Sequence, residues 1–204
     1  MKQVNLKELK KVFEDSREEV WQAAKAAGHE PKIYIHWTAG RYDKCFSDYH
    51  VNITGAGNIY ISTDNMSTVL SHTWRRNSGS IGIALCCAYG AGSTGLGSYP
   101  PTAKQIEVVA QVIDVVAEAL WLTIDKKHVM THGEAANNED GDFSYHKPYA
   151  WWNDSYGDGD TRGDLEYLGT SESPKYNPWA TDGSRGGDVL RGKANWYKNQ
   201  RECS

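Results

Sequence analysis

The sequence predicts an α/β layered fold, in which helices pack on a mixed central β-sheet. Two long amphipathic patterns, one at the N-terminus and one near the middle of the chain, are typical of surface helices. Short apolar runs between and after them are typical of strands. The order of helix, strands, helix and strand requires a sheet that helices cover. A chain of 204 residues is long enough to bury a sizeable core within one domain.

The first part of the chain contains a helix, a strand and a hairpin. Apolar residues recur with helical spacing over residues 5–27, which predicts an amphipathic helix that ends at Gly28. Residues 32–36 (KIYIH) predict a short core strand. Residues 48–53 and 58–62 flank the turn sequence TGAG, which is typical of a β-hairpin.

The remaining elements begin with the most apolar segment of the chain. Residues 80–89 are almost continuously apolar, which predicts a central strand covered on both faces. Thr102 caps a long helix, and residues 128–132 (HVMTH) predict a last short strand. From about residue 137 onward, abundant Gly, Asp, Asn, Trp and Tyr with little periodicity predict long loops. We expect only short helices there, near residues 147–152 and 164–168.

The composition excludes several classes of protein. The formal net charge is −4, so we expect no basic surface of the kind that binds nucleic acid. No segment is long and apolar enough to span a membrane, and the N-terminus lacks the apolar run of a secretory signal. We therefore expect synthesis as a cytoplasmic product. The four cysteines fit no CxxC zinc pattern, which favours reduced structural thiols.

Two histidines stand at the ends of predicted strands, where a sheet fixes side chains and loops leave room for a substrate. His36 ends the strand over residues 32–36, and His132 ends the strand over residues 128–132. One such histidine alone is more often structural, but two at matching strand ends favour metal ligands. Catalytic zinc usually has three protein ligands and leaves a fourth position for water.

Several short motifs follow one another along the chain: IHWTAG, DYHVNI, HTWRRNSGSIGIAL, a helix that begins with Pro-Thr, and THGEAA. Their order and spacing, from about residue 30 to residue 168, resemble the zinc-dependent N-acetylmuramoyl-L-alanine amidases of type 2. That family includes phage amidase-type lysozymes and peptidoglycan recognition proteins. The resemblance implies one Zn²⁺ per chain and a peptidoglycan substrate. It also implies that a zinc-activated water hydrolyses the amide between N-acetylmuramic acid and L-alanine.

The same resemblance implies a domain organisation. An amidase domain would span residues 1–168, with the N-terminal helix over residues 5–27 and a loop insertion at about 137–160. Residues 169–204 would form a Gly-rich and aromatic-rich extension packed on the same domain. A monomer is the default expectation.

The metal ligands are also implied by the resemblance. The two histidine ligands of the family fall on His36 and His132. The third ligand of the family is an Asp or Cys that usually follows a Lys by two positions, and no such pair lies shortly after His132. The best match is TRGDL, in which Arg162 precedes Asp164 by two positions. The alternatives are Asp160, His146 and Asp158.

Three catalytic residues follow from the motifs. Tyr49, in DYHVNI, matches a position where some amidases carry a catalytic tyrosine. Arg162 stands where the family commonly has Lys, and its charge could stabilise the tetrahedral oxyanion. Glu134 could serve as a general base or as a partner of a ligand histidine. By strand alternation, His50 faces away from Tyr49, so core packing or support of a ligand is expected for it.

The motifs also carry candidate substrate-binding residues, namely Trp37, His72, Arg76, Asn77 and Ser80. Structural roles remain open beside the binding roles. His72 could lie in a plain surface loop, and Asn77 and Ser80 could cap the strand. Arg76 could pair with stem-peptide carboxylates, or it could form a solvated pair of charges with Arg75.

Two rival functions remain open. A peptidoglycan-binding module could keep the binding groove without turnover, and another zinc amidohydrolase could share the fold. The biological setting is open as well. The enzyme could act on the cell wall after release or delivery, as an endolysin does, or it could recycle muropeptides in the cytoplasm.

Overall fold

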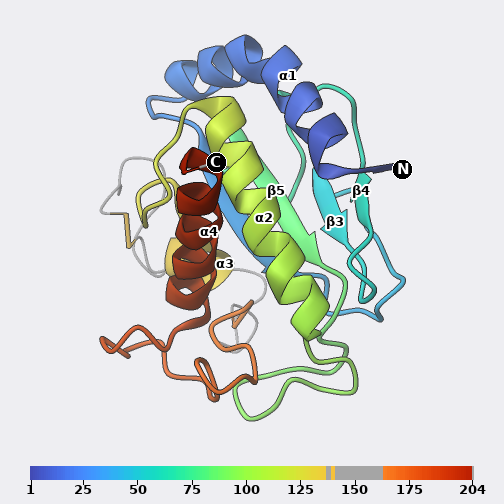
Figure 1. The fold of residues 1–204 in the computed structure, drawn as a ribbon, viewed down its shortest axis with the longest axis vertical. Coiled ribbons are helices and arrows are strands. Elements are labelled where there is room, and N and C mark those ends of the chain that lie inside the picture. The colour runs from blue at the N-terminus through green and yellow to red at the C-terminus, as the bar shows by residue number, and fades with distance from the viewer. Residues whose placement is uncertain (137–138, 141–162, 204) are drawn as a thin grey trace.

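The computed structural model describes residues 1–136, 139–140 and 163–203 and contains helices packed on one mixed sheet (Figure 1). The predicted α/β layered fold is therefore confirmed. The strands of the described residues have the order β1-β4-β3-β5-β2-β6. The elements, in chain order, are β1 (Lys2–Val4), α1 (Leu6–Ala26), β2 (Lys32–Trp37), β3 (Val51–Ile53), β4 (Ile59–Ile61), β5 (Ser80–Leu85), α2 (Ala103–Leu120), β6 (Val129–Thr131), α3 (His132–Ala136) and α4 (Gly186–Glu202).

The sheet has a parallel half and an antiparallel half. Strands β3 and β5, β5 and β2, and β2 and β6 pair in parallel, so β2 and β5 lie inside the sheet. Strands β3 and β4 form the predicted antiparallel hairpin, and β1 adds an antiparallel edge strand that the sequence did not predict. Because the parallel strands share one direction, the carboxyl ends of β5, β2 and β6 meet at one edge.

Both long helices begin with the side-chain caps that their sequences encode. The Asn5 side chain accepts a hydrogen bond from the Glu8 N–H at 2.9 Å, and the Glu8 carboxylate accepts one from the Asn5 N–H at 2.8 Å. Thr102 and Gln105 form the same reciprocal cap on α2, as expected for Thr102. The Gln105 amide also donates to the carbonyl oxygens of Ile53 and Cys86, which fixes α2 to the ends of β3 and β5.

Side-chain alternation gives the sheet two different faces. On β2, Ile33, Ile35 and Trp37 join the apolar core beneath the helices, together with matching positions of β5. Figure 1 shows α2 lying across this face of the sheet, and α2 packs against both α1 and α4. Tyr34 and His36 therefore project from the opposite face. The apolar face stabilises the fold, and the opposite face is left for polar groups.

Three local predictions were wrong. Residues 164–168 form a turn rather than a short helix, and the helix expected near 147–152 lies outside the described residues. The central strand ends at Leu85, although the backbone of Ala88 still forms a parallel bridge with Gly40. The loop-rich tail contains α4, whose low hydrophobicity and glycines hid its helical pattern.

Among the described residues, no helix combines the length and the apolar character that a membrane span needs.

The close approach of α1 to the start of β5 gives a testable prediction. Gly79 has a φ of +64°, and a Cβ atom there would lie 2.3 Å from the Cα of Ala24 in α1. Gly79→Ala should lower the free energy of unfolding by more than about 2 kcal/mol, through strain and this clash. A Cβ atom on Gly192, in α4, would have no neighbour within 4 Å, so Gly192→Ala is the matched control.

The control should raise the free energy of unfolding by about 0.5–1 kcal/mol, because alanine favours a helix over glycine. Urea denaturation of both variants measures the difference. Equal effects of the two substitutions would contradict the proposed contact between Gly79 and α1.

Candidate metal centre

Three polar side chains converge at the carboxyl edge of the parallel strands. His36 is the penultimate residue of β2, and His132 directly follows β6 as the first residue of α3. Since β2 and β6 are neighbouring parallel strands, the two histidines meet at the same edge. Asp164 approaches them from the turn that begins at Gly163. All three side chains are buried.

The ligand atoms of this His36–His132–Asp164 cluster form a nearly regular triangle. The two Nδ1 atoms are 3.1 Å apart, and Oδ2 of Asp164 lies 3.5 Å from Nδ1 of His36 and 3.3 Å from Nδ1 of His132. Two atoms bound at about 2.0–2.1 Å to a tetrahedral zinc ion lie about 3.4 Å apart. Two imidazoles and one carboxylate are also a donor set that zinc accepts. The cluster therefore fits one metal ion in both spacing and chemistry.

The electrostatics keep Asp164 in the form that a ligand needs. Burial alone raises the pKa of a carboxyl group, but the adjacent His132 and His36 outweigh burial here and hold the pKa of Asp164 well below its usual range. Asp164 is therefore ionised at neutral pH. A carboxylate buried beside two imidazoles attracts a cation, because a cation would balance its charge.

A residue that the sequence analysis missed orients His36. Oγ1 of Thr73 lies 3.3 Å from Nε2 of His36 and 2.9 Å from Nδ1 of His72. A hydroxyl can accept a hydrogen bond from one nitrogen and donate to the other. Thr73 therefore connects the two rings and holds the His36 ring on its Nε2 side, which leaves Nδ1 facing Asp164. The only sequence signal was the position of Thr73 beside His72 in the motif HTWRRN.

His72 is buried behind His36 rather than exposed in a surface loop. Its ring centroid lies 5.3 Å from that of His36 and 5.6 Å from that of His50. The pKa of His72 lies well below its usual range because the ring is buried and faces other imidazoles. Gly82 makes room for this ring, since a Cβ atom there would lie 2.6 Å from Cγ of His72. His72 therefore supports the cluster from behind.

Tyr49 lies next to the metal cluster, whereas Trp37 lies on the other face of the sheet. The half-buried Tyr49 ring lies beside His36, with 5.1 Å between the ring centroids. This places the Tyr49 side chain next to the metal cluster. Trp37 follows His36 but points to the other face of the sheet, where it is part of the apolar core. The structure thus gives Trp37 a packing role and does not support the predicted substrate contact.

Asn77 and Ser80 organise a loop instead of facing a groove. Oδ1 of Asn77 accepts hydrogen bonds from the N–H groups of His72 and Thr73. The buried Ser80 hydroxyl donates to the carbonyl oxygen of Arg76 at 2.6 Å and lies 3.0 Å from that of Asn77. These bonds favour the capping alternative over the predicted role in substrate binding.

Arg76 is buried, so the expectation of a solvated pair of charges with Arg75 is wrong. The Arg76 guanidinium donates to the Asp140 carboxylate at 2.9 Å and to the Tyr34 hydroxyl at 3.2 Å. Arg75 is exposed and stacks over the Trp74 ring. The Asp140 pair places the Arg76 charge inside the protein, which argues against contact with a stem-peptide carboxylate.

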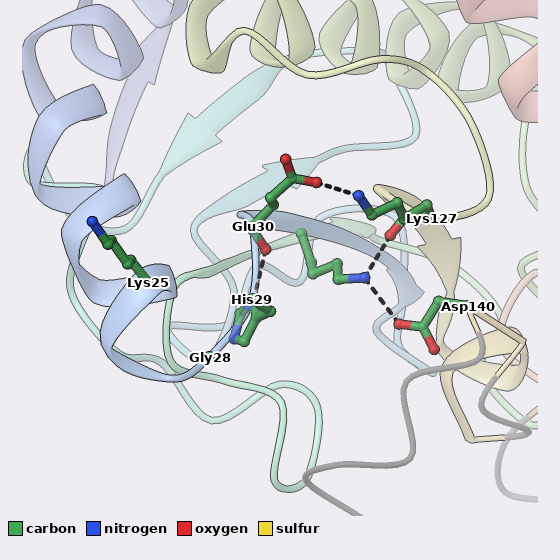
Figure 2. A pocket seen from close by; sticks show the side chains of 7 residues that line it. Lys25, Gly28, His29, Glu30, Lys127 and Asp140 are labelled. Carbon is green, nitrogen blue, oxygen red and sulfur yellow. Dashed lines mark hydrogen bonds and ion pairs between the residues drawn. The ribbon is translucent and has the colours of Figure 1, made fainter.

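Asp140 also borders a polar pocket (Figure 2). The pocket lies at the amino end of β2, whereas His36 is near the carboxyl end of that strand. Lys32 begins β2 and donates to Asp140 at 3.0 Å and to the Lys127 carbonyl oxygen at 2.7 Å. The Lys127 ammonium pairs with Glu30 across the pocket. Lys32, Asp140, Lys127 and Glu30 thus pair with one another at this end of β2, and none of them belongs to the metal cluster.

Glu134 lies two residues after His132, but its carboxylate is already engaged. It is fully buried, and its two oxygen atoms accept hydrogen bonds from Arg191 at 2.7 and 2.8 Å. It also accepts one from the Thr131 N–H at 2.9 Å. Both oxygen atoms are therefore occupied by hydrogen bonds within the protein. The contacts of Glu134 therefore support a structural role and not the predicted general base.

The other candidates cannot be placed. Arg162, which was predicted to stabilise the oxyanion, lies outside the described residues. The same holds for the alternative third ligands His146, Asp158 and Asp160.

The chain is thus an α/β protein in which a buried group of two histidines and one aspartate could hold a metal ion. The family model of the N-acetylmuramoyl-L-alanine amidases matches residues 22–144, which is more than half of the chain. The chain belongs to this family. The matched region contains His36 and His132, whereas Asp164 lies beyond it.

Two solved structures are similar over half of the chain. The endolysin and N-acetylmuramoyl-L-alanine amidase LysCS from Clostridium intestinale URNW is 17% identical, with a TM-score of 0.40 and coverage of 50% of this chain and 68% of that chain. The Ph2119 endolysin from the Thermus scotoductus MAT2119 bacteriophage Ph2119 is 20% identical, with a TM-score of 0.40 and coverage of 50% and 71%. No curated protein matches the chain at a significant level of sequence similarity.

The buried His50 gives a pH-dependent prediction. Its Nδ1 accepts a hydrogen bond from the Gly82 N–H, its Nε2 bonds to the Thr68 carbonyl oxygen, and burial lowers its pKa to about 4. In the unfolded chain the imidazole titrates near 6.5. The unfolded state therefore binds more protons between these values, and stability is lost as the pH falls from about 6.5 to about 4.

The free energy of unfolding of the metal-free protein should fall by about 3 kcal/mol through this one group across that pH range. Urea denaturation of the wild type and of His50→Gln at several pH values measures it. The variant should have the shallower pH dependence, whatever its stability at neutral pH. Parallel curves would show that His50 does not titrate on unfolding as described.

Proposed function

We propose that this chain hydrolyses the amide between N-acetylmuramic acid and L-alanine in peptidoglycan, with one zinc ion held by His36, His132 and Asp164. The observation that carries the proposal is the triangle of ligand atoms with sides of 3.1, 3.3 and 3.5 Å. Membership of the amidase family supports the choice of substrate. Three protein ligands leave a fourth position of a tetrahedral ion for water, as hydrolysis requires.

Each residue of the cluster has a separate role in this proposal. A bound zinc ion would lower the pKa of a water molecule toward about 7 and polarise the scissile carbonyl group. Asp164 contributes the negative charge of the ligand set, because its depressed pKa keeps it ionised. Thr73 holds His36 with Nδ1 turned toward the other two ligands. His132 directly follows β6 as the first residue of α3 and supplies the second imidazole.

Tyr49 is the proposed donor beside the reacting groups. Its ring lies against His36 and is half-buried, so the phenol combines a fixed position with access from outside. Such a hydroxyl can orient the attacking water or donate to the oxyanion of the tetrahedral intermediate. The stabilising charge of Arg162, two residues before Asp164, stays a prediction from the sequence.

Metal content and peptidoglycan digestion, measured on one purified sample with and without a chelator, test the proposal. We expect about one zinc ion per chain, release of stem peptides free of sugar, and loss of activity on chelation. Wall binding without products would instead favour a recognition module. Products cut at another bond would favour a different amidohydrolase. Soluble muropeptides tested beside intact wall distinguish a lytic enzyme from a recycling enzyme.

Removal of a ligand should abolish metal binding. His36→Ala, His132→Ala and Asp164→Asn should each weaken zinc affinity by more than about 100-fold, which exceeds the usual effect of losing an outer partner. Hydrolysis should be lost in parallel. His29→Ala is the matched control, because His29 lines the distant pocket at the start of β2. Zinc affinity is measured by competition with a chromogenic chelator, and full affinity in any ligand variant would remove that residue from the site.

Tyr49→Phe separates catalysis from metal binding. The substitution keeps the ring beside His36 and removes only the hydroxyl group. Turnover should fall by about 10- to 1,000-fold, the usual range for a lost proton or oxyanion donor. Zinc content and thermal stability should stay at the wild-type level. Unchanged kcat would mean that the Tyr49 hydroxyl takes no part in the reaction.

A further inference from the structure

Two residues of the metal cluster lie on segments that the sheet does not hold. His36 is inside β2, between two hydrogen-bonded neighbours, whereas His132 begins the five-residue helix α3 and Asp164 lies in a turn. In both segments a buried glutamate follows the cluster residue by two positions, namely Glu134 and Glu166. A short helix and a turn need an external support to keep their side chains within a fraction of an ångström.

The first support is the pair of Arg191 with Glu134. Arg191 is a buried residue of α4, and its guanidinium binds both carboxylate oxygens of Glu134, at 2.7 and 2.8 Å. The same group donates to the carbonyl oxygen of Val129 in β6 at 2.9 Å. Arg191 therefore fixes α3 relative to β6, and His132 is the residue between them.

The second support is the pair of Arg185 with Glu166. The Arg185 side chain, just before α4, donates to the two carboxylate oxygens of Glu166 at 2.9 and 3.0 Å. Its remaining terminal nitrogen donates to Glu139 at 2.7 and 2.8 Å. The Gly186 N–H also donates to the backbone carbonyl oxygen of Glu166 at 2.9 Å. Arg185 and Gly186 therefore hold the turn that carries Asp164.

The two supports meet at the start of α4. The Thr131 hydroxyl donates to Glu166 at 3.2 Å, and the Thr131 N–H donates to Glu134, so one residue connects both carboxylates. A Cβ atom on Gly186 would lie 1.7 Å from the Leu165 carbonyl oxygen, and one on Gly187 would lie 2.6 Å from Glu134. Only glycine permits this approach. The glycines that weaken α4 as a helix are thus required for its contact with the cluster segments.

We propose that Arg185 and Arg191 are positioning residues of the metal centre, through which the N-terminal part of α4 sets the separation of His132 and Asp164. The inference rests on the proposed role of those two residues as metal ligands. Bidentate guanidinium–carboxylate pairs restrict both distance and orientation. Loss of either pair lets one ligand move while the fold remains, so the main effect falls on metal affinity.

The test measures metal binding and coordination geometry instead of turnover. Arg185→Lys and Arg191→Lys keep the buried positive charge but lose the bidentate geometry. Zn²⁺ affinity is measured by chelator competition at a temperature at which circular dichroism shows each variant folded. The visible absorption of the Co²⁺-substituted protein reports the coordination geometry. We expect each variant to bind Zn²⁺ about 10- to 100-fold more weakly, with a weaker and shifted Co²⁺ band.

The matched control is Arg201→Lys. Arg201 lies in the same helix and pairs with Asp114 and Glu118 of α2, so its substitution loosens α4 without touching the cluster segments. Its Zn²⁺ affinity should stay within about twofold of the wild type and its Co²⁺ spectrum should be unchanged. The Zn²⁺ affinities of Arg185→Gln and Arg191→Gln are measured as well if these variants fold. If they do not fold, the affinities of the two lysine variants alone test the inference.

Two results would overturn the inference in different ways. Wild-type affinity and a wild-type Co²⁺ spectrum in the Arg185 and Arg191 variants, with only the melting temperature lowered, would reduce both residues to structural ion pairs and leave the proposed function intact. Failure of the wild type to bind Zn²⁺ or Co²⁺ would remove the metal centre itself, and the positioning role with it.

Discussion

The burial of Asp164 against His36 and His132 is the constraint on which the rest of the structure depends. A buried carboxylate is costly unless opposite charge or hydrogen bonds compensate it. Here the two imidazoles hold its pKa below the usual range, and the triangle they form with it leaves room for one cation. Only one of the three residues comes from a strand interior. The architecture must therefore bring two irregular segments to the end of β2 and hold them there.

The sheet meets this constraint through its two unlike faces. Ile33 and Ile35 are buried against the helices, so Tyr34 and His36 of the same strand project into a second buried layer on the other side of the sheet. That layer contains His72 behind His36, and it requires the missing side chain of Gly82 in the neighbouring strand. Burial of apolar side chains on the helix-covered face of the sheet thus stabilises the histidine cluster on the opposite face. The histidine cluster could not stabilise the fold by itself.

Local sequence patterns predicted the elements that local interactions determine. The cap at Thr102, the apolar periodicities and the TGAG turn predicted α1, α2 and the hairpin correctly. Local sequence patterns do not predict an element that is stabilised by residues far away in the sequence. Helix α4 has three glycines and a polar surface, and the glutamate partners of Arg185 and Arg191 lie outside the helix, earlier in the chain. The sequence suggested that Glu134 is a general base or a partner of a ligand histidine for the same reason, since nothing near it in sequence reveals Arg191.

The cluster residues differ in the same way, because the family motifs identify two of them and the structure is needed to establish the third. His36 and His132 lie within the matched residues 22–144, and motif order alone singles them out. Asp164 lies beyond that region, and only the spacing after Arg162 suggested it in the sequence. In the structure its carboxylate completes the triangle, next to the turn that Arg185 holds. The region that defines the family therefore does not contain the whole cluster. The residues after the matched region supply Asp164 to the cluster, and Arg191 binds Glu134 two residues after His132, so the geometry of the cluster depends on both parts of the chain.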